Sequence, residues 1–183
     1  MSAPWNRGLP TNIEMGGKEY PIRSDYRAVL DVFLALTDPD LDEFNRLMEV
    51  LEIFYVDDVP VDLWKEALDN CMWFLNGGNE EKGQKGPQLV SWEQDFNLIA
   101  SPISRVIGQD IRGMEYLHWW SFLSAYMAIG DCLFAQVVAI RDKKARGKPL
   151  EKYEREFYRR NRDLIDIKKR LTDAEVKILG EWM

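Results

Sequence analysis

Large apolar side chains recur every three or four residues along most of this chain of 183 residues, a spacing that places them on one face of an α-helix. Such runs cover residues 26–34, 41–54, 63–75, 92–106 and 150–164. Each apolar stripe has to be buried against another element. The pattern therefore predicts a mainly α protein, a bundle of about six to eight helices forming a single domain over residues 1–183.

Residues 9–23 depart from this period and predict a small N-terminal β-hairpin. Gly16 and Gly17 tolerate the positive φ angles of a two-residue turn, and the flanking residues alternate in polarity. Ile13 should then face Tyr20 across the hairpin. Because a lone hairpin is marginally stable in water, this one should lean on the helices.

The run from Trp119 to Gly130 contains no charged residue, so a membrane span has to be weighed against buried helices. The run is shorter than the roughly 20 residues that a span needs, and Asp131 would lie inside the bilayer. Gly130 and Asp131 are better interpreted as the junction of two buried helices. We expect no membrane association.

Charge divides the chain into an acidic body and a basic end. Residues 1–140 hold 22 acidic and 10 basic side chains, whereas residues 141–183 hold 9 acidic and 14 basic ones. Residues 77–89 are rich in glycine and predict a flexible loop before the second half of the body. We expect 141–183 to be a basic helical segment and the acidic body to repel nucleic acid.

Within that segment, one predicted helix carries a set of arginines that could face a partner protein. Leu150, Tyr153, Phe157 and Leu164 would form its narrow apolar stripe. The arginines around the stripe are Arg155, Arg159, Arg160 and Arg162. A solvated helix face is the plainer alternative for them. Nucleic-acid binding is disfavoured because acidic side chains interrupt the positive charge.

The chain offers few groups for catalysis. His118 is the single histidine, and Cys71 and Cys132 are too few for a thiolate metal site. No phosphate loop, GxSxG, HExxH or CxxC motif is present in the sequence. We therefore expect no enzymatic activity, no metal and no cofactor. The first residues lack the pattern of a secretory signal, which favours a reducing cytoplasm.

Two polar residues fall within apolar patterns and need buried partners. Asp95 shares a helix face with Trp92 and Ile99, where an unpaired carboxylate would be costly. A buried Asp95–His118 hydrogen bond is one hypothesis, and a helix-terminus N–H or an arginine is another.

The segment Leu117-His118-Trp119-Trp120 is a candidate structural or interface motif. Its adjacent indoles point about 100° apart on a helix, so only one can reach the centre of the same core. The other should pack against the body or mark a protein interface.

Several segments together resemble the phage gp-fifteen family, small tail-morphogenesis proteins of long-tailed phages of Gram-positive bacteria. The resemblance covers roughly residues 9–170 and centres on Leu117-His118-Trp119-Trp120-Ser121-Phe122. The other matching segments are Ile22-Arg23-Ser24-Asp25-Tyr26-Arg27, Ser91-Trp92-Glu93-Gln94-Asp95 followed by Ile99, Gly108-Gln109-Asp110-Ile111, and Ile140-Arg141.

This resemblance implies a tail assembly chaperone that binds the tape-measure protein and keeps it soluble until tail-tube subunits polymerise around it. It implies action in the host cytoplasm and absence from the mature virion. Further partners suggested by the resemblance are the tail-tube protein, a second copy of the chain and a second form of the chaperone.

Two other classes of function stay open at this stage. One is a structural tail or head-completion component that is retained in the virion. The other is an enzyme using Asp95, Asp110 or His118, which requires these groups to converge on an open pocket.

Overall fold

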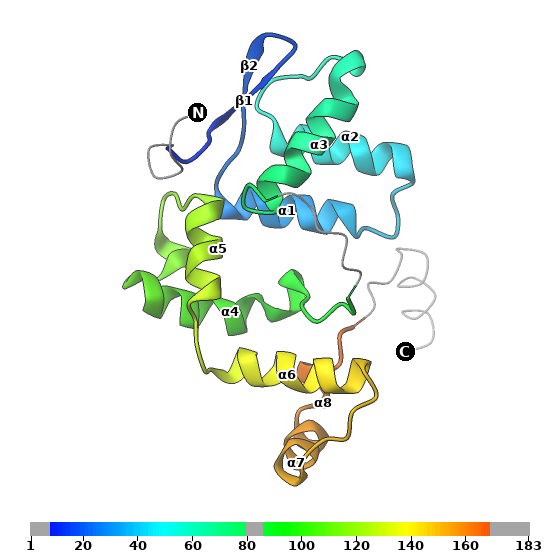
Figure 1. Ribbon diagram of the computed structural model, residues 1–183, viewed down its shortest axis with the longest axis vertical. Helices are drawn as coiled ribbons and strands as arrows, with labels where there is room; N and C mark the ends of the chain where they lie inside the picture. The colour runs from blue at the N-terminus through cyan, green and yellow to red at the C-terminus, as the bar shows by residue number, and fades with distance from the viewer. Residues whose placement is uncertain (1–7, 80–85, 169–183) are drawn as a thin grey trace, which may run out of the picture. The chain divides into compact units, whose positions relative to one another are not determined.

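A computed structural model describes residues 8–79 and 86–168 of the chain (Figure 1). Eight α-helices and one two-stranded antiparallel sheet lie within these residues, which confirms the predicted mainly α fold with an N-terminal hairpin. Parts of the predicted loop 77–89 and of the basic segment 141–183 lie outside them. The chain divides into two compact units, and the single domain stays a prediction.

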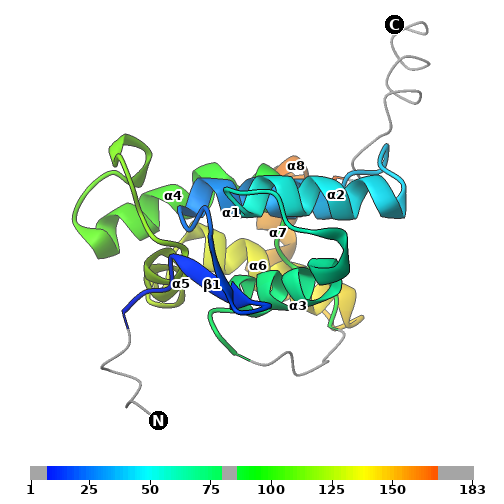
Figure 2. The same ribbon diagram turned by 90° about the horizontal axis from the view of Figure 1, so that it is seen from above.

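Among the described residues, the first unit comprises 8–79 and 116–123. Its described elements are β1 (Asn12–Met15), β2 (Lys18–Pro21), α1 (Tyr26–Leu36), α2 (Glu43–Phe54), α3 (Trp64–Leu75) and the start of α5 (Trp119–Met127). Helix α1 packs against α2, and α2 packs against α3. In Figure 2 the segment before β1 passes close to the start of α5, where Pro10 contacts His118.

The second unit comprises residues 86–115 and 124–168 of the described chain. Its helices are α4 (Trp92–Ile107), the end of α5, α6 (Leu133–Ala145), α7 (Lys152–Arg160) and α8 (Arg162–Ile165). Helix α6 packs against both α4 and α8. Its core centres on Val137, Ile140 and Ile165, and Leu98, Leu150, Phe157, Tyr158 and Leu164 pack around them.

The hairpin forms in the predicted register. Ile13 pairs with Tyr20, and both side chains are buried together with Met15. Gly16 and Gly17 have φ angles of 57° and 75°, which side chains with a Cβ rarely adopt. The presence of glycine at both positions therefore explains the two-residue turn.

Capping side chains set where several helices begin. Asp25, Asp42 and Ser91 each accept a backbone N–H from the first turn of α1, α2 and α4. Serine is a favoured N-cap residue, so the sequence pattern favours Ser24 as the cap of a helix that begins near Tyr26, which is wrong by one residue. The carbonyl of Ser24 instead accepts the N–H of Trp119, so its backbone is committed to α5.

Stacked aromatic side chains fill the core of the first unit. Tyr26 of α1 stacks on Phe122 of α5 with ring centroids 4.8 Å apart, and Trp119 stacks on the same Phe122 at 5.3 Å. Phe54 of α2 meets Phe74 of α3 at 5.3 Å. All five side chains are buried, so aromatic contacts join α1 to α5 and α2 to α3 in the core of this unit.

The uncharged run 119–130 contains the nine residues of α5 and a turn before α6. Gly130, with φ of 63°, lies in that turn, at the predicted junction of two helices. Among the described residues, none of the helices has both the length and the hydropathy needed to cross a bilayer.

Candidate functional site

The segment Leu117–Trp120 joins the starts of α5 and α1 through the backbone. The N–H of Tyr26 donates to the carbonyl of Leu117 at 2.9 Å, and the N–H of Trp119 donates to the carbonyl of Ser24 at 2.8 Å. These bonds form an isolated antiparallel bridge between Asp25 and His118. Two helices far apart in sequence therefore begin side by side.

Asp25 strengthens this junction with its carboxylate. One oxygen accepts the backbone N–H of Arg27, which caps α1, and the other accepts the N–H of Leu117 at 2.8 Å. The Arg27 guanidinium also pairs with Asp25 at 2.7 Å. Burial raises the pKa of the Asp25 carboxyl, but the hydrogen bonds from Arg27 and Leu117 outweigh it, so the net pKa is lowered.

His118 occupies the position immediately before α5 and acts as a cap. Its Nδ1 lies 3.0 Å from the backbone nitrogen of Trp120, so Nδ1 accepts that hydrogen bond. The ring proton therefore sits on Nε2, which donates to the carbonyl of Pro10 at 3.0 Å. Burial lowers the pKa of His118. A neutral imidazole thus ties the residues before the hairpin to α5.

The adjacent indoles both bind the end of α3. Trp119 Nε1 donates to the carbonyl of Leu75, and Trp120 Nε1 donates to the carbonyl of Phe74, each at 2.9 Å. The last carbonyls of a helix have no partner within the helix, so these two indoles supply the missing donors. Trp119 is buried and Trp120 is half-buried, so both pack against the body.

Glycines complete that helix end. The N–H groups of Gly77 and Gly78 donate to the carbonyls of Phe74 and Trp73, the two bonds of a Schellman motif. Gly78 has a φ of 80°, and a Cβ built there would lie 2.8 Å from Cη2 of Trp120. The close approach of the indole therefore requires glycine at this position.

The partner of Asp95 is Arg141 of α6, which corrects the predicted Asp95–His118 pair. Arg141 donates to the two carboxylate oxygens at 2.6 and 2.9 Å, and Asp95 also accepts the N–H of Ser91 at 2.9 Å. The arginine and helix-terminus alternatives that the sequence left open are therefore both realised. Both ring nitrogens of His118 have the partners described above.

Arg141 uses all five of its N–H donors. Besides its two bonds to Asp95, it donates to the carbonyls of Leu89, Leu164 and Ile165 at 2.6 to 2.9 Å. Its side chain is 5% exposed and that of Asp95 is fully buried. This network connects α6 to the start of α4, to Leu89 in the segment before it and to the end of α8.

The predicted basic helix is two helices. Asn161 ends α7, and its side chain donates to the carbonyl of Phe157, so Arg162 begins α8 instead of continuing the helix. Tyr153 of the predicted apolar stripe is exposed. The remaining members of the basic set, Arg155, Arg159 and Arg160, are exposed on α7, and whether they face a partner stays a prediction.

Asp110, Asp95 and His118 have separate structural roles. Asp110 is exposed, caps the 3₁₀ turn Ile111–Gly113 and pairs with Arg112, which lowers the pKa of Asp110 to about 2. Asp95 is bound by Arg141, and His118 by Pro10 and Trp120. Within the described residues, no group of three or more His, Cys, Asp or Glu side chains could hold a metal ion.

A concave surface of the first unit lies along the end of α2 and the start of α3, and we call it the α2–α3 groove. Its hollow has a volume of about 400 Å³. The apolar residues that line it are Met48, Leu51, Tyr55, Val56, Val59 and Trp64, and the charged ones are Arg23, Glu52, Asp57 and Asp58. Trp64 is held by a hydrogen bond from its indole to the carbonyl of Val59 at 2.9 Å.

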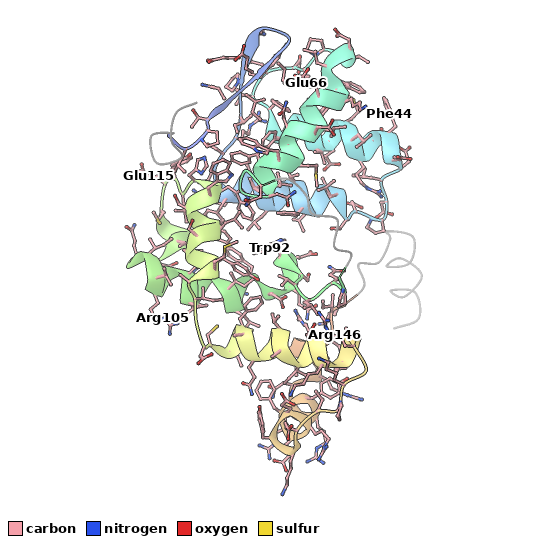
Figure 3. The ribbon with its side chains drawn as sticks, in the orientation of Figure 1. Phe44, Glu66, Trp92, Arg105, Glu115 and Arg146 are labelled. Carbon is pink, nitrogen blue, oxygen red and sulfur yellow. The ribbon has the colours of Figure 1, made fainter. Side chains whose placement is uncertain are left out.

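Exposed apolar side chains extend this groove. Phe44, labelled on α2 in Figure 3, is 61% exposed and contacts the Trp64 ring with centroids 5.9 Å apart. Val56, which lines the groove, is 51% exposed. The helical spacing of Phe44, Met48 and Leu51 had indicated a buried face, but part of that face is open to solvent. Only the packing of α2 against α3 decides which residues of this face are buried and which are exposed.

Comparison with known proteins gives a family for the chain. The family described as Bacteriophage Gp15 protein has a model that matches residues 6–167. No curated protein and no solved structure matches the chain. The matched range includes the Leu117–Trp120 segment, the Asp95–Arg141 pair and the α2–α3 groove.

Proposed function

This chain belongs to the Bacteriophage Gp15 family, and from that membership we propose that it is a tail assembly chaperone. The family is one of phage structural and assembly proteins. In the proposed role the protein binds the tape-measure protein in the host cytoplasm, keeps it soluble while the tail tube polymerises, and is absent from the mature virion. The action is binding without chemistry.

The observation that carries this proposal is the open apolar surface around the α2–α3 groove. A long helical protein aggregates when its apolar stripes stay exposed, and a holding protein needs an apolar surface on which to receive them. Phe44, which contacts Trp64, and Val56, which lines the groove, supply such a surface. Scattered exposed apolar residues are ordinary, but contiguous ones beside a hollow are typical of binding sites.

Other parts of the structure support a scaffold for binding. The Leu117–Trp120 segment and the Asp95–Arg141 network use their polar groups to connect helices. In the proposed role these groups hold the scaffold together, and other surfaces of the helices bind the partner. Arg155, Arg159, Arg160 and Arg162 are a second proposed partner-facing surface. The tail-tube protein, a second copy of the chain and a second chaperone form are further proposed partners.

Co-expression with the tape-measure protein of the same phage tests the proposal. We expect a larger soluble fraction of the tape-measure protein and its retention on the tagged chain. A tape-measure protein whose solubility is unchanged, and which is not retained, would rule out the chaperone.

Mass spectrometry of purified virions separates the chaperone from a structural tail or head-completion component. We expect the chain to be missing from the particle. Its presence at a fixed ratio to the tube protein would favour the structural alternative.

A further inference from the structure

The α2–α3 groove lies in the most acidic part of the chain. Residues 38–69 hold eleven acidic and two basic side chains, a net charge of -9 where the entire chain carries -7. Three of these carboxylates, from Glu52, Asp57 and Asp58, line the groove itself. The most acidic part of the chain therefore contributes three carboxylates to one apolar hollow.

The carboxylates of the groove are available to an outside charge. Glu52, Asp57 and Asp58 are exposed, and among the described residues they form no ion pair. Among the residues that the structure describes, Arg23 is the one basic residue lining the groove. Its Nη1 atom lies within 3.0 Å of the carbonyls of Glu52, Ile53 and Tyr55, so it caps the end of α2.

We infer that the α2–α3 groove binds an amphipathic helix of a partner protein whose apolar face is flanked by lysine or arginine. The apolar side chains of that helix enter the hollow beside Met48, Val56 and Trp64, and its basic side chains meet Asp57 and Asp58. A hollow of about 400 Å³ receives side chains, and Phe44 extends the apolar contact along α2. Charge complementarity selects a basic partner over an acidic one.

This inference deepens the proposed function, because the helix it describes would belong to the tape-measure protein. It can nevertheless be tested without that protein. Two synthetic amphipathic peptides with the same leucine face, one with lysine and one with glutamate on the polar face, serve as probes for the full-length chain. Fluorescence anisotropy of the labelled peptides measures their binding.

We expect the lysine peptide to bind about tenfold more tightly than the glutamate peptide, and the difference to shrink as salt is added. The double variant Asp57→Lys with Asp58→Lys should remove most of this preference. Val56→Asp should weaken binding by placing a charge in the apolar part of the groove. Circular dichroism of each variant establishes that it is folded.

The matched control reverses two exposed carboxylates elsewhere, Asp131→Lys with Glu156→Lys, and changes the net charge by the same amount. This control should keep the preference of the wild-type chain for the lysine peptide. If the two double variants lose it equally, binding follows net charge alone and the inference is overturned.

The tape-measure pulldown with the same variants keeps the two proposals apart. If the wild-type chain and the Asp57/Asp58 variant retain the tape-measure protein equally, the α2–α3 groove is rejected as the binding site, and the chaperone function is supported. Failure of the wild-type chain to retain the protein would reject the chaperone, while the peptides still decide on the groove. Sedimentation provides a further check, since a wild-type dimer that dissociates in the Asp57/Asp58 variant would make a second copy the occupant and overturn the inference.

Discussion

Nδ1 of His118 accepts a hydrogen bond from the backbone N–H of Trp120, 3.0 Å away. Because Nδ1 has to be unprotonated to do this, the bond fixes the ring as the neutral tautomer that donates from Nε2 to Pro10. A protonated ring would direct a second N–H at the N–H of Trp120. The lone histidine is therefore a structural link whose strength depends on pH.

We expect the contribution of His118 to stability to fall as the pH falls. Burial lowers the pKa of His118 below its ordinary value of 6.5, so the unfolded chain takes up the proton first. The contribution is present above pH 6.5 and is lost as the pH drops through the lowered pKa of the folded state. Urea unfolding of the wild-type chain and of His118→Asn, measured from pH 7.5 to pH 5, tests this.

Because the chain has one histidine, the difference between these two proteins isolates its titration. Asparagine can still cap α5 but lacks the bond to Pro10. The stability difference should be about 1 kcal/mol at neutral pH and should shrink in acid. A constant difference across the range would contradict the assignment.

Gly78→Ala should destabilise the first unit more than an ordinary left-handed glycine would. The new Cβ would lie 2.8 and 3.0 Å from two ring carbons of Trp120, in addition to the strain of a φ of 80°. Gly17→Ala is the matched control, since Gly17 has a φ of 75° and no neighbour within 4 Å of a Cβ. We expect about 1–2 kcal/mol for Gly17→Ala and a further 1–3 kcal/mol for Gly78→Ala, measured by urea unfolding. Equal losses would show that Trp120 can move aside.

Arg141→Met should be severely destabilising, by about 3–5 kcal/mol, because it leaves the buried carboxylate of Asp95 without its cation. Removing the charge as well, in Asp95→Asn with Arg141→Met, should restore only part of the loss. The carbonyls of Leu89, Leu164 and Ile165 still lack the donors that Arg141 supplied. Chemical unfolding followed by circular dichroism measures each variant.

Arg112→Met is the control for this experiment, since Arg112 pairs with Asp110 at the surface. Solvent screens an exposed pair, so this variant should unfold close to the wild-type midpoint. A double variant as stable as the wild-type chain would show that the three carbonyl bonds contribute nothing.

The two cysteines should differ in reactivity. Burial raises the pKa of the Cys71 thiol to about 12, whereas Cys132 is half-buried before α6. The thiolate is the reactive form of a cysteine. A thiol reagent at neutral pH should therefore label Cys132 quickly in the folded chain, and both cysteines after denaturation. Cys132→Ser should abolish the fast reaction. Rapid labelling of Cys71 in the folded Cys132→Ser variant would show that its helix opens readily.

Local patterns in the sequence were sufficient for most of the secondary structure, although the break between α7 and α8 was missed. The two-residue turn at Gly16 and Gly17 and the pairing of Ile13 with Tyr20 follow from φ preferences and from alternation along the chain. The helices follow from period-3.6 spacing, with boundary errors such as Ser24 in place of Asp25. These features depend on residues close together in the chain, so one sequence contains the information that they need.

The hydrogen-bond partners of the buried polar residues were harder to predict from the sequence. The sequence identified Asp95 as a buried carboxylate in need of a partner, but Arg141 lies 46 positions away and His118 was an equally reasonable candidate. An arginine next to Ile140 in an apolar helix was the available signal. Choosing between the two required knowing that α6 packs against α4.

The Leu117–Trp120 segment shows, within one motif, both what local sequence determines and what depends on packing. Helix geometry alone predicted that its adjacent indoles must point to different places, and the charge pattern alone placed the negative charge in the body of the chain. That both indole N–H groups bind the end of α3, and that three of the carboxylates of residues 38–69 line an apolar hollow, depended on how the helices pack. Spacing along a chain determines which residues share a face, whereas long-range packing determines what each face meets.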